Sequence, residues 1–101
     1  MASFEKAPEV DDDLRSIVAY TADRWGVEQV RKYMAGLEAK MDAIATGQAH
    51  TTQLDHVIDG LRVGRYERHY IFGVERDEAP MLILAVFHEK MSVIERLKER
   101  F

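Results

Sequence analysis

The chain has 101 residues, a formal net charge of −4 and no cysteine. This length corresponds to a single domain over residues 1–101, and the lack of cysteine excludes disulfides, thiolate catalysis and cysteine-ligated zinc. The acidic balance argues against a protein that grips nucleic acid mainly through phosphates. The sequence has no apolar run of ~20 residues and no basic-then-apolar leader, so we expect a cytoplasmic protein that does not enter a membrane.

The first half of the chain predicts an amphipathic helix after a short strand. Residues 2–7 are the candidate strand, and Pro8 suits the first turn of a helix because its φ angle is fixed and its missing N–H is not needed there. Gly26 can adopt the left-handed conformation that ends a helix. Side chains that suit a core recur at helical spacing between these points, at Leu14, Ile17, Val18, Thr21 and Trp25.

A second helix is predicted over residues 27–46, before Gly47. Its apolar stripe consists of Val30, Tyr33, Met34, Leu37, Met41 and Ile44. The two helices form a hairpin whose combined stripe needs a large apolar surface to cover it. Residues 48–60 are polar and their conformation is not predicted, although one helical turn through Leu54, Val57 and Ile58 is a candidate.

The second half of the chain predicts a meander of three antiparallel strands. The first occupies residues 61–68, the second begins at His69, and the third runs from Met81 to Phe87 without a polar side chain. A continuous apolar run is typical of a strand covered on both faces, so we expect the third strand inside the sheet. We place the break before it at residues 77–80, because Pro80 cannot donate to a ladder.

A final helix is predicted from Ser92, whose spacing to Glu95 matches a capping box. Ile94, Leu97, Lys98 and Phe101 would turn one face of this helix toward the body. The predicted fold class is therefore α+β, with an N-terminal helical hairpin packed on a small twisted antiparallel sheet, followed by a C-terminal helix.

The sequence lacks the common catalytic and cofactor motifs. His50 and His56 lie six residues apart, which is not the spacing that directs two imidazoles at one ion, so no metal site is predicted. There is no glycine-rich phosphate loop and no serine in a nucleophile elbow, so we expect no cofactor. The hinge at Gly26 is too tight for a helix-turn-helix reader, and no sequence-specific nucleic-acid binding is expected.

Cationic side chains gather in the predicted sheet and at its ends. They are Arg62, Arg65, Arg68 and Arg76, together with His69, His88 and Lys90. Arginines on a strand face can clamp phosphates or carboxylates through paired hydrogen bonds. They can equally cover a half-exposed sheet and pair with Glu67 and Glu75, and the spacing does not decide between these readings.

The order of the segments is more informative than any one of them. The helical hairpin carries the pattern Asp13-Leu14…Ile17…Tyr20…Trp25-Gly26…Gln29…Tyr33…Leu37, and the sheet carries Gly60-Leu61-Arg62, His69-Tyr70-Ile71-Phe72 and Val86-Phe87-His88 with Lys90-Met91. In this order they resemble the ParE branch of the ParE/RelE toxin superfamily over nearly the whole chain. The family often has Asp where this chain has Ser92, and both residues are strong N-caps.

The resemblance implies the RelE/ParE-like fold and the toxin of a type II toxin–antitoxin pair, neutralised by a cognate antitoxin that is ParD-like or similar. Members like ParE poison DNA gyrase, and in that role the protein would not be an enzyme. Candidate contacts to gyrase, by resemblance, are Lys90, Arg96, Lys98 and Arg100. Candidates for a binding rim on the sheet are Arg62, Arg76 and His88.

Two alternative functions stay open. RelE-like members cut mRNA on the ribosome, and in that case Arg62 or Arg68 would stabilise the phosphate while His88 acted as general acid or base. This chain lacks the terminal tyrosine of some nuclease members, which favours the gyrase-directed branch. The remaining alternative is a toxin-fold protein that has lost its toxicity and only binds its antitoxin.

Overall fold

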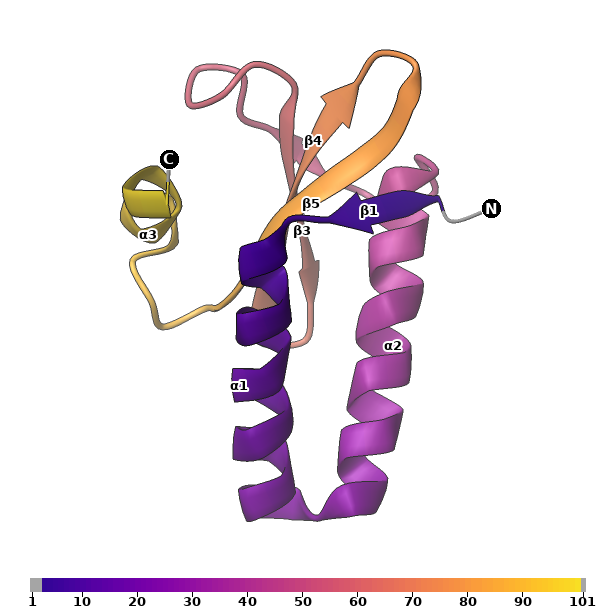
Figure 1. The fold of residues 1–101 in the computed structure, drawn as a ribbon, viewed down its shortest axis with the longest axis vertical. Coiled ribbons are helices and arrows are strands. Elements are labelled where there is room, and N and C mark those ends of the chain that lie inside the picture. The colour runs from indigo at the N-terminus through magenta and orange to yellow at the C-terminus, as the bar shows by residue number, and fades with distance from the viewer. Residues whose placement is uncertain (1–2, 101) are drawn as a thin grey trace.

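Three helices and five strands occupy residues 3–100, the part of the chain that the computed structural model describes (Figure 1). In chain order they are β1 (Phe4–Lys6), α1 (Pro8–Trp25), α2 (Val27–Ala45), β2 (Thr52–Gln53), β3 (Leu61–Tyr66), β4 (His69–Arg76), β5 (Ala79–His88) and α3 (Val93–Arg100). Two predicted placements, Ala2 in the first strand and Phe101 in the last helix, lie outside the described residues. The α+β class and all three predicted helices are confirmed.

The sheet is mixed, so the prediction of a purely antiparallel sheet is wrong. Its strand order is β1-β5-β4-β3-β2. β1 runs parallel to β5, with Phe4 opposite Met81, whereas the other neighbours are antiparallel. Parallel neighbours need a long crossover, and here the helical hairpin and three strands separate β1 from β5 along the chain. β5 lies between β1 and β4, which confirms its predicted interior position.

The helical hairpin turns at one glycine. Gly26 has a φ of 87°, a value that glycine adopts without steric cost. Its N–H donates to the carbonyl of Ala22 at 3.0 Å, and its own carbonyl accepts from Val30 at 3.2 Å. The two helices lie side by side and extend well beyond the sheet (Figure 1).

Both faces of the sheet are covered by apolar side chains. The core between the hairpin and the sheet consists of Val10, Ile17, Leu37, Met41, Ile44, Ile71, Met81, Ile83 and Val86. The core on the opposite face consists of Leu61, Phe72, Leu84, Ala85 and Phe87 from the strands and Leu97 from α3. Because β5 contributes to both cores, its uninterrupted apolar run is explained by burial on each side.

The hairpin turns between strands are tighter than predicted. β3 ends at Tyr66 rather than at residue 68, since Glu67 has a φ of 52° and forms a turn with Arg68. The next turn uses only residues 77–78, with Glu78 at a φ of 59°, so β5 already contains Pro80. Pro80 has no partner in the β4 register, and pairing with β1 starts one residue later. Its missing N–H therefore interrupts no ladder, and the predicted break at 77–80 is too long.

Residues 48–60, left without a prediction, include β2 and a turn. Thr52 of β2 pairs with Val63 of β3. The N–H groups of Val57 and Ile58 then donate to the carbonyl of Leu54 at 2.9 and 3.3 Å, so the candidate turn forms. These three apolar side chains pack against the core that contains Phe72.

The far end of the hairpin carries apolar side chains that nothing covers in the described part of the chain. Trp25 is 70% exposed and Val27 is 64% exposed. Val18 is also exposed, so the predicted stripe of α1 is wrong at Val18 and Trp25. The helices extend beyond the sheet, so the last turns of α1 and the first turns of α2 have no strand to pack against (Figure 1). No helix within residues 3–100 is long and apolar enough to cross a bilayer.

The exposed tip leads to a stability prediction. Trp25→Ser is expected to change the free energy of unfolding by no more than about 0.5 kcal/mol, as for other exposed positions without packing partners. Urea denaturation of both proteins measures the difference. A loss above about 1.5 kcal/mol would mean that Trp25 is buried in solution.

Candidate functional site

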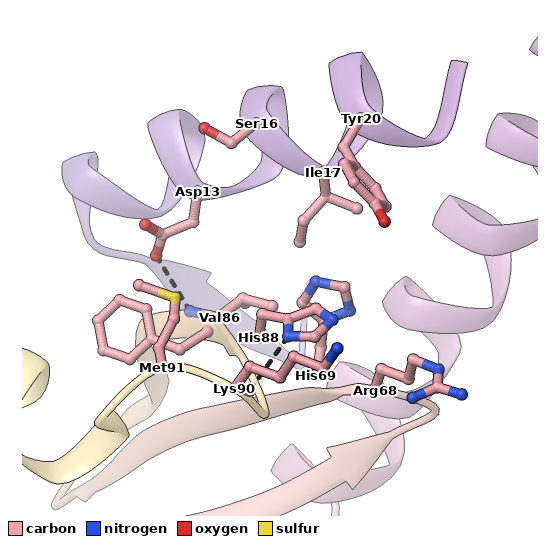
Figure 2. Close-up of a pocket in the computed structure, with 11 residues that line it drawn as sticks. Asp13, Ser16, Ile17, Tyr20, Arg68, His69, Val86, His88, Lys90 and Met91 are labelled. Carbon is pink, nitrogen blue, oxygen red and sulfur yellow. Dashed lines mark hydrogen bonds between the residues drawn. The ribbon is translucent and has the colours of Figure 1, made fainter. Parts of the chain in front are cut away.

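A pocket of about 590 Å³ opens between α1 and the end of the β4–β5 hairpin (Figure 2). It is lined by Asp13, Ser16, Ile17 and Tyr20 of α1, by Arg68 of the β3–β4 turn, by His69, Val86, Phe87 and His88 of strands β4 and β5, and by Lys90 and Met91 after β5. Ile17 and Tyr20 point from the helix toward the two imidazoles (Figure 2). The pocket therefore joins apolar walls to a cationic and imidazole-bearing edge.

Two histidines face each other at this edge. His69 and His88 are directly opposite in the β4–β5 register, and their ring centroids lie 5.3 Å apart at an angle of 89°. Tyr33 of α2 continues the row, with its ring 5.5 Å from His69 and 5.1 Å from Tyr66. The hydroxyl of Tyr33 lies 2.5 Å from Nδ1 of His69. A helix, two hairpin strands and β3 thus hold one aromatic row.

Burial keeps two groups of this row neutral. Burial, together with a smaller contribution from the neighbouring His88, lowers the pKa of His69 to about 4. Burial likewise raises the pKa of Tyr33 to about 12. Near neutral pH, Tyr33 therefore keeps its proton and His69 carries no charge. Neither group is poised for acid–base catalysis at that pH.

The hydrogen bonds assign the tautomer of each imidazole. The other acceptor near the Tyr33 hydroxyl, the carbonyl of Tyr66, lies 3.5 Å away, at the limit for a hydrogen bond. The contact with Nδ1 of His69 is much the shorter, and we infer from it that the hydroxyl donates to Nδ1, which places the proton of that neutral ring on Nε2. His88 accepts the backbone N–H of Lys90 at its own Nδ1, at 3.1 Å. Both rings accordingly carry Nε2–H when neutral.

The lowered pKa of His69 predicts a contribution to acid sensitivity. The unfolded histidine takes up a proton below its ordinary value of about 6.5, while the folded residue resists protonation down to about 4. This contribution to stability is present above pH 6.5 and is lost as the pH falls from 6.5 toward 4. When the pH falls from 7.5 to 5.5, the free energy of unfolding measured by urea denaturation should decrease more for the native protein than for His69→Gln. His56→Gln, an exposed control, should match the native protein; equal slopes for all three would contradict the prediction.

The arginines of the sheet are paired with carboxylates. Arg62 Nε lies 2.5 Å from Glu75 Oε1, which confirms the predicted pairing with Glu75. Arg65 and Arg68 both pair with Glu89 instead of Glu67, the Arg68 contact being 2.9 Å. Arg76 pairs with Glu5 of β1. All four arginines are therefore paired with carboxylates, as the second reading expected, but the predicted pairing with Glu67 is wrong because Glu89 and Glu5 take its place.

The structure separates the members of both predicted sets of sheet residues, the nuclease candidates (Arg62, Arg68 and His88) and the rim candidates (Arg62, Arg76 and His88). Arg68 and His88 line the same pocket, but Arg62 lies four residues along β3 from Tyr66, about 13 Å away at the rise of a strand. Arg76 lies at the other end of β4 from His69. Each set is thus divided between the two ends of the sheet, with Arg62 and Arg76 away from the pocket that holds Arg68 and His88. Within residues 3–100, no three metal-ligating side chains come together.

The cationic residues after β5 fall into two groups. Lys90, Arg96 and Lys98 are exposed. The side chain of Arg100 is only 18% exposed, and its two Nη atoms lie 2.9 Å from the two carboxylate oxygens of Asp13. Arg100 also donates to the carbonyl of Leu84 at 3.0 Å. It ties the end of α3 to β5 and α1.

Asp13 is the site residue that the sequence prediction missed. Besides Arg100 it accepts the backbone N–H of Val86 at 3.0 Å, and its side chain is 10% exposed. Its partner lies 87 residues away, so no local pattern reveals the pair. The available signal was its place in the hairpin pattern that begins Asp13-Leu14.

Comparison with known proteins identifies the family. Residues 4–93 match the family model described as the ParE toxin of the type II toxin–antitoxin system parDE. The chain belongs to the ParE toxin family. Toxin ParE of Escherichia coli is 36% identical over 100 residues, which cover 99% of this chain and 97% of that protein. Toxin ParE1 of Mycobacterium tuberculosis is 28% identical over 87 residues, or 86% and 89% of the two chains. The resemblance to the ParE branch is confirmed.

Proposed function

We propose that this ParE-family toxin acts in the cytoplasm by poisoning DNA gyrase as a protein ligand, without chemistry of its own, and that a ParD-like antitoxin neutralises it. The match to the ParE toxin family over residues 4–93 carries this proposal. The paired arginines and the neutral state of Tyr33 and His69 support a binding protein over a nuclease. ParE family membership implies a cognate antitoxin.

The C-terminal helix offers the surface for gyrase. Leu97 is fully buried against the sheet, so the opposite face of α3 is presented to solvent. Arg96 and Lys98 are exposed on this helix, and Lys90 precedes it. Arg100 serves as a positioning residue, because its bidentate bond to Asp13 fixes the orientation of the helix. We therefore assign the contact to Lys90, Arg96 and Lys98, supported by Arg100.

The test is gyrase-catalysed supercoiling with purified protein. The native chain should inhibit supercoiling and accumulate cleaved DNA, and the double variant Arg96→Glu/Lys98→Glu should need at least about tenfold more protein, or about 1.4 kcal/mol. Arg31→Glu/Lys32→Glu, which makes the same charge change on exposed residues of α2, is the control and should keep full potency. No inhibition by the native chain, at a dose that stops growth, would overturn the proposal.

The nuclease alternative is supported by one observation, the shared pocket of Arg68 and His88. Primer extension on cellular mRNA during induction separates it from gyrase poisoning. Codon-positioned cuts that appear before a DNA-damage response, and disappear in His88→Gln, would favour the nuclease. Harmless overproduction of folded protein without antitoxin would favour the third reading, a non-toxic antitoxin-binding protein.

A further inference from the structure

The pocket beside α1 presents donors without acceptors. Both imidazoles use Nδ1 for a bond within the protein and carry Nε2–H. Within residues 3–100, neither Nε2 nor the ammonium of Lys90 has a hydrogen-bond or ion-pair partner. Figure 2 shows the two rings below Ile17 and Tyr20, with the Lys90 side chain running beside His88. Three donors thus border one space.

The acidic groups around this space are already engaged. Asp13 is held by Arg100 and by the backbone of Val86. Glu89 is held by Arg65 and Arg68, and its side chain is only 21% exposed. The charge of Lys90 therefore has no compensating carboxylate in the pocket, and the electrostatics favour an anionic ligand.

The form of the pocket limits the class of anion. Its walls include Ile17, Val86, Phe87 and Met91, which favour an apolar group next to the anion. Arg65 and Arg68 share the single carboxylate of Glu89, so the pocket offers the free charge of Lys90 and at most one further charge that is not compensated. This matches a singly charged carboxylate better than a chain of phosphates, which needs several cations.

We propose that this pocket is a receptor for an Asp or Glu side chain, flanked by an apolar side chain, from a bound polypeptide. The carboxylate accepts from Nε2–H of His69, Nε2–H of His88 and the ammonium of Lys90, and the neighbouring apolar side chain lies against Ile17 and Met91. The inference does not depend on gyrase being the target. If the native chain does not inhibit supercoiling, the pocket can still bind the carboxylate. If the pocket does not bind the carboxylate, the gyrase proposal is unaffected.

The receptor is expected to bind more tightly in mild acid. A bound carboxylate favours the charged form of His69 and raises the pKa of that ring, so proton uptake and binding reinforce each other. Besides His88 and Lys90, the charged and titratable groups near His69 or its partner Tyr33 are Tyr66, Glu67, Arg68 and Glu89, and α1 brings Asp13 and Tyr20 to the same pocket. Of these, Arg68 and Glu89 are paired with each other and Tyr33 stays protonated. Binding of the carboxylate is therefore coupled to protonation of His69, and for this reason we expect the affinity to rise from pH 7.5 to 5.5.

The experiment is a titration followed by NMR of the histidine ring nitrogens in the full chain. The probe is the blocked tripeptide acetyl-Leu-Glu-Leu-amide, with acetyl-Leu-Gln-Leu-amide as its neutral match. We expect Nε2–H tautomers for both His69 and His88 in the free protein. The Glu peptide should shift the ring-nitrogen resonances of both histidines, and it should bind more tightly at pH 5.5 than at 7.5. The Gln peptide should bind at least about tenfold more weakly, as expected for loss of a charge-assisted bond.

Variants separate the pocket from general charge. Lys90→Gln should weaken the Glu peptide about tenfold, whereas Lys98→Gln, an exposed lysine on α3, should leave its affinity unchanged. Equal binding of the Glu and Gln peptides, or Nδ1–H tautomers in the free protein, would overturn the proposal. Inorganic phosphate or a hexauridylate RNA that competes with the Glu peptide at lower concentration would also overturn it, and would assign the pocket to phosphate.

Discussion

Asp13→Ala is expected to lower the free energy of unfolding by about 3 kcal/mol. The native carboxylate is 10% exposed and accepts two hydrogen bonds from Arg100 and one from the backbone of Val86. Alanine leaves the charge of Arg100 without a carboxylate, since only its hydrogen bond to the carbonyl of Leu84 remains, and leaves the Val86 N–H without a partner, in a site largely shielded from water. The cost is set mainly by these stranded groups rather than by the lost attraction. For a domain of this size it corresponds to a fall in Tm of more than about 10 °C.

Urea denaturation measures this loss, and a neighbouring aspartate supplies the control. Asp12 also forms an ion pair, with Arg15, but the two side chains are 83% and 71% exposed. Asp12→Ala should therefore change stability by less than about 0.5 kcal/mol. Arg100→Met removes the other partner of the pair. Its long side chain still covers the ring of Phe87, over which the guanidinium lies at 4.8 Å, so its loss of stability reports on the ion pair rather than on lost packing. A loss below about 1 kcal/mol in Asp13→Ala would show that water solvates this pair freely.

The same substitution separates stability from orientation of the C-terminal helix. α3 is joined to the body by Leu97 and its apolar neighbours and by the Asp13–Arg100 pair. Without the pair, amide hydrogen exchange in α3 should become faster relative to the core strands. If α3 is the surface for gyrase, the folded Asp13→Ala protein should also lose potency, although Asp13 does not lie on the proposed contact surface.

The sequence predicts the helices well because apolar spacing reports directly on the face that a helix buries. Leu37, Met41 and Ile44 were predicted in the core and lie there. The same rule fails at Trp25, because spacing does not reveal that the hairpin extends past the end of the sheet. The sequence also does not predict that the sheet is mixed. β1 has only three residues, two of them charged, and its direction depends on the path of all the strands between.

The pocket depends on a register that the sequence does not display. Pairing shifts from Phe72 opposite Ala85 to Gly73 opposite Ile83, so Leu84 is an extra residue on β5. A slip of one residue would turn His88 to the other face and away from His69. The individual cations were predictable from composition and position. Their partners Glu89 and Asp13 depend on contacts between distant segments, which spacing along the chain does not encode.

Gly36→Ala is expected to lower the free energy of unfolding by about 2 kcal/mol, through overpacking. Within an exposed helix the substitution would stabilise by up to about 1 kcal/mol, because alanine has the higher helix propensity. Gly36 lies where α2 passes Tyr66, and an added Cβ would overlap the hydroxyl of Tyr66 and lie 2.5 Å from its Cζ. The ring must move, and its contact with Tyr33 at 5.1 Å is lost.

A double substitution tests whether the clash is the cause. In a Tyr66→Ala background the obstruction is gone, so Gly36→Ala should change sign and stabilise by up to about 1 kcal/mol. The row from Tyr66 through Tyr33 to His69 adds a second readout. When Tyr66 is displaced, Tyr33 and His69 become more accessible to water, and the pKa of His69 should rise from about 4 toward its ordinary value. If Gly36→Ala still lowers the free energy of unfolding in the Tyr66→Ala background, the strain lies in the helix itself. An unchanged pKa of His69 would mean that α1 and β5, rather than α2, keep this ring buried.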